Sequence, residues 1–438
     1  MGKSRTTPRG TSRFVSWLVP GLGIKRWMIV ILAGITMLAV GTGIFLLDLY
    51  RTDTQNPLIL TLLRLLALQF LPRIARVLIF AALGAGLVGY GIWRLNRALL
   101  RPFVRPGKPL VEQLASYRRL DRGPRVVAIG GGHGISSLLR GLKEHTRNIT
   151  AIVTVADDGG SSGRLRASLG ILPPGDIRNC LAALSNDEAL LTQLFQYRFS
   201  GAPELQGHSF GNLFITALTD LTGSFEEAIA ESGRALSVSG RVLPSTLHAV
   251  RLLADLRLPH TLNEVRVEGE SKIPEMAGRV RRVWLEPNNA PAFPPTLQAV
   301  LKADLIVVGP GSIYTSLLPN LLVPELQAAL KASRAVKVYV CNIATQAGET
   351  DLYTCHDHVR ALEEHAGEEL FDVVLCNGRY EGDLGGAQWV RVDERSRGDQ
   401  RLYVADLLNT EFPWRHDSEK LATVLMDVFA ERTGPLSD

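Results

Sequence analysis

Two long apolar runs stand near the start of the chain. Residues 27–47 carry no charge over 21 positions, and residues 77–93 carry none over 17. A helix needs about 20 apolar residues to cross the hydrocarbon core of a bilayer, so the pattern predicts transmembrane helices at about 27–47 and 77–93. A cleaved signal peptide fits less well, because the first run is too long and no small-x-small cleavage site precedes Asp48.

Basic residues flank the two runs. Six precede the first run, five follow the second and four lie between them. The positive-inside rule therefore predicts a multi-pass hairpin in the plasma (inner) membrane, with both ends and the rest of the chain in the cytoplasm. Residues 57–72 are apolar around a central Arg64, which favours an interfacial or re-entrant helix over a third span. Residues 94–123 are expected to form a basic linker. Together with the hairpin they make up a membrane-anchor domain, residues 1–123.

The pattern changes from about residue 125 onward. Short runs rich in Val and Ile alternate with helical periodicity, which is typical of buried parallel strands joined by helices. The predicted strands are 125–129, 149–155, 305–308, 336–341 and 371–376. Residues 240–290 instead predict an antiparallel insertion, with short strands around 241–243, 265–268 and 280–285. The expected fold of residues 124–438 is α/β: a Rossmann-like, doubly wound, mainly parallel sheet with this small insertion.

Charge is divided unevenly between the two parts. Residues 1–120 hold 17 Lys and Arg against 3 Asp and Glu, whereas residues 121–438 hold 31 against 40. The globular part is therefore acidic, which argues against a nucleic-acid partner and requires any anionic ligand to be held by local loops. The four cysteines, Cys180, Cys341, Cys355 and Cys376, form no C-x-x-C pair. They are expected to be buried thiols in a reducing compartment, without a disulfide framework or a zinc site.

Glycine-rich loops follow the first two predicted strands. Gly130–Gly134 (GGGHG) follows the first, and backbone N–H groups there can approach a phosphate at the start of the next helix. Residues 156–164 (ADDGGSSGR) follow the second and provide another anion nest, with Arg164 as a cationic donor. Asp157 and Asp158 could hold a divalent ion or a ribose, or could simply cap local turns.

Three further loops repeat this pattern. Residues 173–179 (PPGDIRN) begin a helix, residues 309–314 (GPGSIY) follow a strand and offer Tyr314 for stacking, and residues 342–345 follow the strand that ends at Cys341. Polar residues at successive strand ends converge in a doubly wound sheet. The sequence therefore predicts one phosphate-binding site at this edge.

Two motifs suggest chemistry that their context does not favour. Gly207–Gly211 matches the G-x-S-x-G nucleophile elbow, but no strand precedes it, so a polar helix start is the better interpretation. Residues 355–358 (CHDH) resemble a metal motif, but Thr354 or Asp357 capping a helix explains them more simply.

The loops carry a family resemblance. Residues 130–134, 154–166, 173–179, 208–212, 308–324, 342–351 and 415–421 resemble, in order, the motifs of the 2-phospho-L-lactate transferase-like (CofD-like) family. The resemblance is strongest to its bacterial gluconeogenesis factor branch. His133 departs from the family pattern, since a small hydroxyl residue is frequent there, and residues 1–120 lie outside the resemblance.

The resemblance implies a regulatory protein that binds a UDP-sugar such as UDP-N-acetylglucosamine, linked to growth on gluconeogenic carbon, the cell wall and cell shape. The resemblance leaves open a second activity: a transferase that uses a nucleotide-activated donor and a divalent metal (Mg²⁺ or Mn²⁺), with Asp157 or Asp158 as metal ligand. It also leaves open whether the chain forms a homo-oligomer. An NAD-dependent oxidoreductase is a third alternative, disfavoured because Ile135 stands at the third glycine position of G-x-G-x-x-G. The expected ligand-binding residues are Gly131, Gly132, His133, Gly134, Asp157, Asp158, Gly159, Gly160, Ser161, Ser162, Arg164, Gly175, Asp176, Asn179, His208, Asn212, Gly309, Gly311, Ser312, Tyr314, Asn342 and Thr345.

Overall fold

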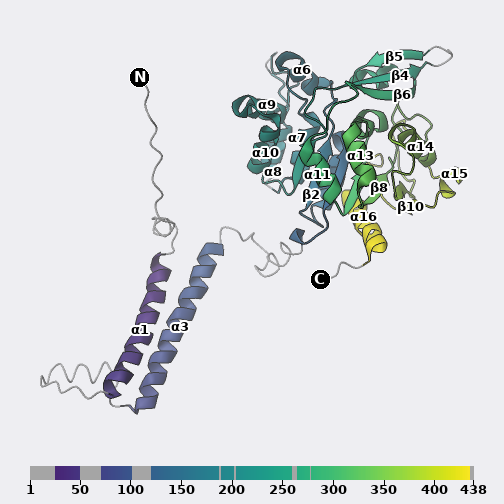
Figure 1. Cartoon of the computed structure of the whole chain (residues 1–438). Coiled ribbons are helices and arrows are strands. Elements are labelled where there is room, and N and C mark those ends of the chain that lie inside the picture. The colour runs from purple at the N-terminus through teal and green to yellow at the C-terminus, as the bar shows by residue number, and fades with distance from the viewer. Residues whose placement is uncertain are drawn as a thin grey trace, which may run out of the picture. The chain divides into compact units, whose positions relative to one another are not determined.

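The computed structural model describes residues 25–49, 71–100, 120–186, 189–201, 204–258, 264–276 and 278–434 (Figure 1). The chain divides into two compact units, Met1–Ala115 and Ser116–Asp438. The interfacial helix expected at 57–72 lies outside the described residues except for its last two positions. Most of the expected basic linker, residues 101–119, also lies outside them.

Among its described residues, the first unit contains the helices α1 (Lys25–Leu49) and α3 (Arg73–Leu100), which pack against each other. Glycines allow this close approach: a Cβ on Gly34 would lie 2.9 Å from the Val88 side chain, and one on Gly84 would lie 2.4 Å from Leu38. Among the described residues, the stretch Leu78–Asn96 is long and apolar enough to cross a membrane, whereas the apolar stretch in α1, Ile29–Gly43, is shorter. The predicted pair of spanning helices is therefore not confirmed.

The second unit is built on a seven-stranded parallel sheet, as the alternating pattern predicted. Its strand order is β10-β9-β8-β7-β1-β2-β3. The strands are β1 (Val126–Gly130), β2 (Ile149–Val153), β3 (Arg241–Pro244), β7 (Leu305–Val308), β8 (Val336–Val340), β9 (Val373–Asn377) and β10 (Leu402–Ala405). All residues of β1, β2, β7 and β9 are buried, which explains why these runs are continuously apolar.

The strand order reverses between β1 and β7. From β1 the chain passes through α5 (Gly132–Leu142) to β2 on one side, and from β7 it passes through α13 (Pro324–Ala332) to β8 on the other. Right-handed crossovers in opposite directions place α5 and α13 on opposite faces of the sheet. The carboxyl ends of β1 and β7 therefore form the topological switch point, where doubly wound proteins bind ligands.

Further helices cover the sheet. They are α6 (Gly160–Leu169), α7 (Gly175–Leu184), α8 (Ala189–Gln196), α9 (Phe210–Thr222), α10 (Phe225–Ala235), α11 (Pro294–Lys302), α12 (Leu318–Leu321), α14 (Cys355–Ala366), α15 (Glu394–Arg397) and α16 (Ser418–Thr433). Helix α16 packs on α5. The two backbones meet at Gly141, where a Cβ would lie 1.9 Å from the Ser418 carbonyl oxygen.

The insertion is smaller than the sequence predicted. Strands β4 (Arg251–Arg257), β5 (Glu264–Glu268) and β6 (Arg279–Glu286) form a separate antiparallel sheet, ordered β5-β4-β6. The short strand expected at 241–243 is not part of it, because β3 pairs in parallel with β2 at the edge of the main sheet. Periodicity does not specify the partner of a four-residue strand, which is why this assignment was wrong.

Two motif interpretations are confirmed by local structure. Ser209 of the G-x-S-x-G match is the N-cap of α9 and accepts a hydrogen bond from the Asn212 N–H. Thr354 and Asp357 form a capping box at the start of α14. The expectation for the cysteines was wrong in one respect, because Cys355 and Cys376, 21 residues apart, form a disulfide where α14 packs beside β9.

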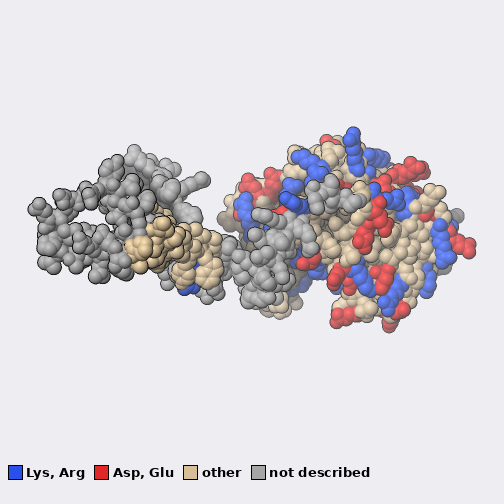
Figure 2. All heavy atoms as spheres, turned by 90° about the horizontal axis from the view of Figure 1, so that it is seen from below, with Lys and Arg blue, Asp and Glu red and all other residues tan. Residues whose placement is uncertain are grey.

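Charged residues of both signs are spread over the globular unit. On the face shown in Figure 2, Lys and Arg are interspersed with Asp and Glu, and the described part of the helical unit is mostly uncharged. The electrostatics of any ligand site must therefore be set by the groups that line it.

Candidate functional site

The glycine loop after β1 forms one wall of the site. Gly131 is the N-cap of α5, and Gly132 has a φ of +62°, in the left-handed region that glycine adopts without strain. A Cβ on Gly134 would lie 2.3 Å from the Pro310 carbonyl oxygen, so this loop packs closely against the loop after β7. The first amides of α5 have no partner within the helix, which makes this end suitable for an anion.

The loop after β7 is held by side chains from the segment that follows β8. The Gly311 N–H donates to Asn342 Oδ1 (3.1 Å), and Asn342 Nδ2 donates to the Gly311 carbonyl (2.9 Å). Ser312 caps the following turn by accepting from the Thr315 N–H, and its hydroxyl donates to the buried carboxylate of Glu349. Three loops from β1, β7 and β8 are thus held together at the switch point.

A cavity of about 830 Å³ opens between these loops. A cleft of this size at a switch point is typical of sites for small molecules or cofactors. Its lining comes from six segments: Gly131–Gly134 with Ser137; Glu270, Ser271 and Pro274; Pro310–Ser312 with Thr315 and Ser316; Asn342–Gln346 with Glu349; Leu384, Gly385 and Ala387; and Trp414–His416.

Cationic side chains gather on the α5 side of the cavity. Burial lowers the pKa of His133, and four arginines lower it further: Arg415, Arg178, Arg140 and Arg198. Burial and the neighbouring Arg415 also lower the pKa of Arg140. Within the described residues, none of these four arginines lies within 4.0 Å of a carboxylate oxygen. The cluster is therefore suited to an anion supplied by a ligand.

Carboxyl groups lie on the other side of the glycine loop. Burial and, to a smaller extent, Asp157 raise the pKa of Asp176 to about 7, against the opposing effects of the Gly132 N–H and Arg178. Burial raises the pKa of Glu270 to about 8, with Asp157 and Asp176 adding to the effect. Asp176 lies against Gly131, where a Cβ would be 2.5 Å from Oδ2. At a pH below these pKa values, both carboxyl groups are protonated and uncharged.

These carboxyl groups do not form a ready metal cage. Asp157 Oδ1 accepts from the Gly159 N–H and Asp158 Oδ1 accepts from the Ser271 N–H, each at 2.9 Å. In the described part of the chain, no three carboxylates bring oxygens within 4.8 Å of one another. A divalent ion here would need the ligand's own phosphates beside one or two carboxylates, as Mg²⁺ commonly does.

The expected site residues fall into two groups. Eight of them line the cavity: Gly131, Gly132, His133, Gly134, Gly311, Ser312, Asn342 and Thr345. The others lie beside or behind it. Tyr314, the expected stacking residue, is buried, and its hydroxyl lies 2.9 Å from that of Tyr353. Gly309 has a φ of +84° where the chain leaves β7.

The remaining expected residues form a hydrogen-bonded network next to the cavity. Asn212 Nδ2 donates to Ser161 Oγ (3.1 Å), which lies 3.0 Å from His208 Nδ1. Arg178 donates to Asn179 Oδ1 (2.8 Å) and Asn212 Oδ1 (3.1 Å). Gly175 packs against Ser162 and Asp157, and Arg164 donates to the Gln206 carbonyl. Gly159 and Gly160 begin α6.

Sequence reasoning missed several residues at the cavity. Glu270 and Trp414 come from the insertion and from the segment before α16, and no glycine-rich motif marks them. Arg415 lies in a motif that carried the resemblance but had no assigned role. Arg140 lies two turns into α5, beyond the glycine loop, and position alone gave no signal for it.

Comparisons with known proteins agree with this arrangement. The family model described as "2-phospho-L-lactate transferase CofD" matches residues 126–431. A solved structure of a UPF0052 family member from Bacillus halodurans is 43% identical, with a TM-score of 0.66, and the match covers 70% of this chain and 99% of that chain.

Two curated relatives differ in how much of the chain they match. A "Gluconeogenesis factor" from Bacillus subtilis is 44% identical over 71% of this chain and 100% of its own length. A "Putative gluconeogenesis factor" from Nostoc sp. is 44% identical over 97% of this chain and 94% of its own length. The matched regions and the arrangement of the loops lead to the same assignment: the chain belongs to the 2-phospho-L-lactate transferase CofD family.

Proposed function

We propose that the globular unit is a cytoplasmic regulatory module that binds a UDP-sugar such as UDP-N-acetylglucosamine. The observation that carries the proposal is the amino end of α5 together with the cationic groups around His133: Arg415 lines the cavity, and Arg140 and Arg178 act on His133 from the last turn of α5 and from α7. Within the described residues, none of the three arginines has a carboxylate oxygen within 4.0 Å. A diphosphate supplies two adjacent negative charges, which match this cluster. The cavity is large enough to continue beyond it toward a sugar or base.

The rest of the cavity lining includes uncharged, hydrogen-bonding groups. Asn342, Thr345 and Gln346 line it together with Trp414, which is about half exposed and available for stacking. Such a set suits hydroxyl, amide and ring groups rather than further phosphates. A lining that combines His133 and Arg415 with several neutral hydrogen-bonding groups supports a nucleotide-sugar over a nucleoside triphosphate.

The site is better equipped to bind than to transfer. Group transfer from a nucleotide donor needs charge stabilisation on the leaving phosphate, normally by a metal or by several cations that contact it. Asp157 and Asp158 are engaged with backbone N–H groups, so neither is poised as a free metal ligand. We therefore favour a sensor linked to carbon metabolism, in keeping with the name of the gluconeogenesis factor that the chain resembles. A link to the cell wall and cell shape is part of the same proposal.

We also propose that α1 and α3 tether the module to the plasma membrane as a hairpin. The apolar stretch Leu78–Asn96 and the glycine contacts between the two helices support this anchor. The relative from Bacillus subtilis is matched along its whole length by 71% of this chain. We therefore propose that the anchor places the binding site at the membrane and contributes no residues to it.

A ligand panel tests the proposal. Full-length protein in detergent is titrated by calorimetry with UDP-N-acetylglucosamine, GDP, GTP and NAD, with and without Mg²⁺. We expect the UDP-sugar to bind at micromolar concentration without metal, and Arg415→Ala to weaken it at least about tenfold, the loss of one charge-assisted contact. Arg334→Ala, which removes an exposed arginine outside the cavity, is the matched control.

Recovery of the ligand separates a sensor from an enzyme. After prolonged incubation with Mg²⁺ or Mn²⁺, we expect UDP-N-acetylglucosamine to be recovered intact. Metal-dependent release of UDP or a nucleoside monophosphate that is lost in Asp158→Asn would establish the transferase alternative instead.

A further inference from the structure

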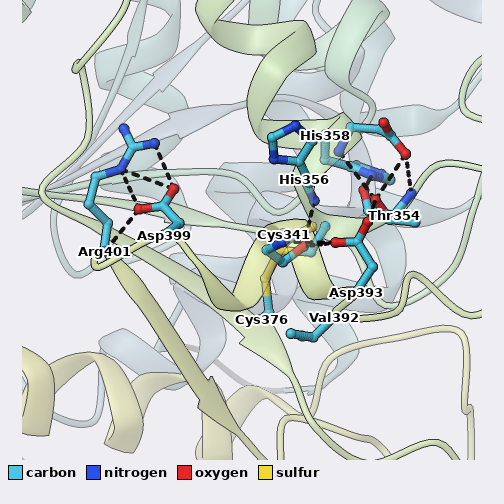
Figure 3. The surroundings of a disulfide bond; sticks show 12 residues. Cys341, Thr354, His356, His358, Cys376, Val392, Asp393, Asp399 and Arg401 are labelled. Atoms are coloured by element: carbon cyan, nitrogen blue, oxygen red, sulfur yellow. Dashed lines mark hydrogen bonds and ion pairs between the residues drawn. A yellow bond between two sulfur atoms is a disulfide. The ribbon is translucent and has the colours of Figure 1, made fainter.

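Three cysteine sulfurs meet beside a residue of the cavity lining. Figure 3 shows the surroundings of the disulfide, with Cys341 and Cys376 labelled. Cys341 follows β8, Cys355 is the first residue of α14, and Cys376 belongs to β9. Their Sγ atoms all lie within 4.8 Å of one another, and each residue is buried. Cys341 immediately precedes Asn342, which lines the cavity and holds the loop after β7. The cluster thus joins three elements beside the site without belonging to its lining.

The cluster contains one sulfur more than its disulfide uses. Cys355 and Cys376 are bonded to each other, while Cys341 is a free thiol. Sulfurs bound to one tetrahedral Zn²⁺ at about 2.3 Å lie roughly 3.8 Å apart. The three sulfurs, all within 4.8 Å of one another, can reach that arrangement once the disulfide is reduced. Buried thiolates are also the ligands that select borderline-soft ions over Mg²⁺ or Ca²⁺.

The local structure favours thiolate at one of these positions. Cys355 is the first residue of a 12-residue helix, where the helix dipole stabilises negative charge. Burial raises the pKa of the Cys341 thiol to about 12, and the Tyr339 hydroxyl and the Asn342 N–H near its sulfur act in the opposite direction. The Tyr339 hydroxyl makes no other hydrogen bond within the described structure. Hydrogen-bond donors around coordinated sulfur are the usual second shell of a metal site.

A candidate fourth ligand lies one turn along the same helix, outside the group of three sulfurs. His358 lies three residues after Cys355 and is fully buried. Its Nδ1 lies 2.9 Å from the Thr354 carbonyl oxygen, and its Nε2 has no hydrogen-bond partner within the described structure. A histidine with one nitrogen held by a carbonyl and the other free is in the form that binds metal ions.

We propose that the reduced chain binds one Zn²⁺ ion through the sulfurs of Cys341, Cys355 and Cys376, with His358 Nε2 as the fourth ligand after a side-chain adjustment. A two-electron reductant first reduces the disulfide to two protein thiols: a dithiol becomes a disulfide itself, and a phosphine takes up the oxygen of one water molecule to become a phosphine oxide. Zn²⁺ then displaces three protons from the three thiols and leaves a site of net charge −1. The ion ties β8, α14 and β9 together behind Asn342.

Zinc stoichiometry of the full-length protein tests this proposal. The protein in detergent is treated anaerobically with a phosphine reductant or left with its disulfide intact, then titrated with Zn²⁺ against a chromophoric chelator. We expect one ion per reduced chain and none at this cluster in the disulfide form. Co²⁺ in place of Zn²⁺ should give the thiolate charge-transfer and tetrahedral d–d absorption bands, a readout that needs no variant.

Variants assign the ligands. Cys341→Ser should weaken zinc binding at least about 100-fold, and His358→Gln at least about tenfold, since each removes a direct ligand. Cys180→Ser changes another buried free cysteine, on α7, and should leave affinity unchanged. A reduced, folded wild-type chain that binds no Zn²⁺ at micromolar concentration, or a Co²⁺ complex without thiolate bands, overturns the site. Unchanged affinity in His358→Gln overturns the fourth ligand.

Discussion

Substituting Gly132 isolates the electrostatic contribution of the glycine loop. Gly132 has a φ of +62°, and a Cβ there would meet only Ser316 Oγ at 3.9 Å, so a side chain fits but adopts a strained backbone conformation. Asn and Asp tolerate this conformation better than other residues, at a cost of about 1 kcal/mol. Gly132→Asn and Gly132→Asp therefore share the strain and the shape and differ in charge.

The difference between these variants can be estimated. A carboxylate about 6 Å from a phosphate charge, at an effective dielectric constant of about 20, costs roughly 2.8 kcal/mol, or about 100-fold in Kd. We expect Gly132→Asn to bind UDP-N-acetylglucosamine within about tenfold of the wild type and Gly132→Asp to bind at least tenfold more weakly than Gly132→Asn.

Calorimetry at low salt measures both affinities, and thermal unfolding serves as the control. An acidic residue in the first turn of α5 favours the helix, so Gly132→Asp should unfold no earlier than Gly132→Asn. Equal affinity in the two variants would show that no phosphate approaches this loop and would refute the assignment of the anion site.

Three further predictions follow from particular contacts. The pKa of Asp176 is raised to about 7 and that of Glu270 to about 8 in the folded chain. Both carboxyl groups therefore lose their protons as the pH rises from 6 to 9, which adds negative charge beside the glycine loop after β1. Affinity for the UDP-sugar should therefore fall over this pH range, and Asp176→Asn should make affinity less dependent on pH. Affinity that rises with pH would instead indicate a metal-dependent site. Gly141→Ala places a Cβ 1.9 Å from the Ser418 carbonyl oxygen and should lower the free energy of unfolding, measured in urea, by about 1–3 kcal/mol. Gly233→Ala is the control: a Cβ there would lie 3.7 Å from its nearest neighbour, so this variant should not be destabilised. Full-length protein should remain in membranes after alkaline carbonate extraction, and labelling of engineered cysteines at 48–76 from the cytoplasmic side would contradict the proposed hairpin.

The sequence was informative where one local pattern determines one structure. The strands β1, β2, β7 and β9 were predictable because strands covered on both faces are mainly apolar. Strand β8 was predictable from its valine-rich run although its first two residues are only partly buried. The capping box at Thr354 and the N-cap at Ser209 were predictable because each needs only a few neighbouring residues. The glycine loops followed from the same logic, since they adjoin strands whose order places them at one edge.

Features that depend on distant segments were not predictable in this way. Glu270 and Trp414 reach the cavity through the insertion and the turn before α16, and neither position has a local signature. The pairing of β3 with β2 and the meeting of Cys341, Cys355 and Cys376 depend on how crossovers pack, which residue spacing does not encode. The cationic cluster likewise combines α5, α7 and the segment before α16.

Hydrogen–deuterium exchange with and without UDP-N-acetylglucosamine tests the central claim most directly, because it reports both binding and its location. At saturating ligand and without added metal, we expect slower exchange in peptides that cover residues 131–137, 311–316, 342–346 and 414–416, with little change in β10 or α15. Unchanged exchange in all four segments, or protection confined to another surface, would contradict the assignment of a nucleotide-sugar to this cavity.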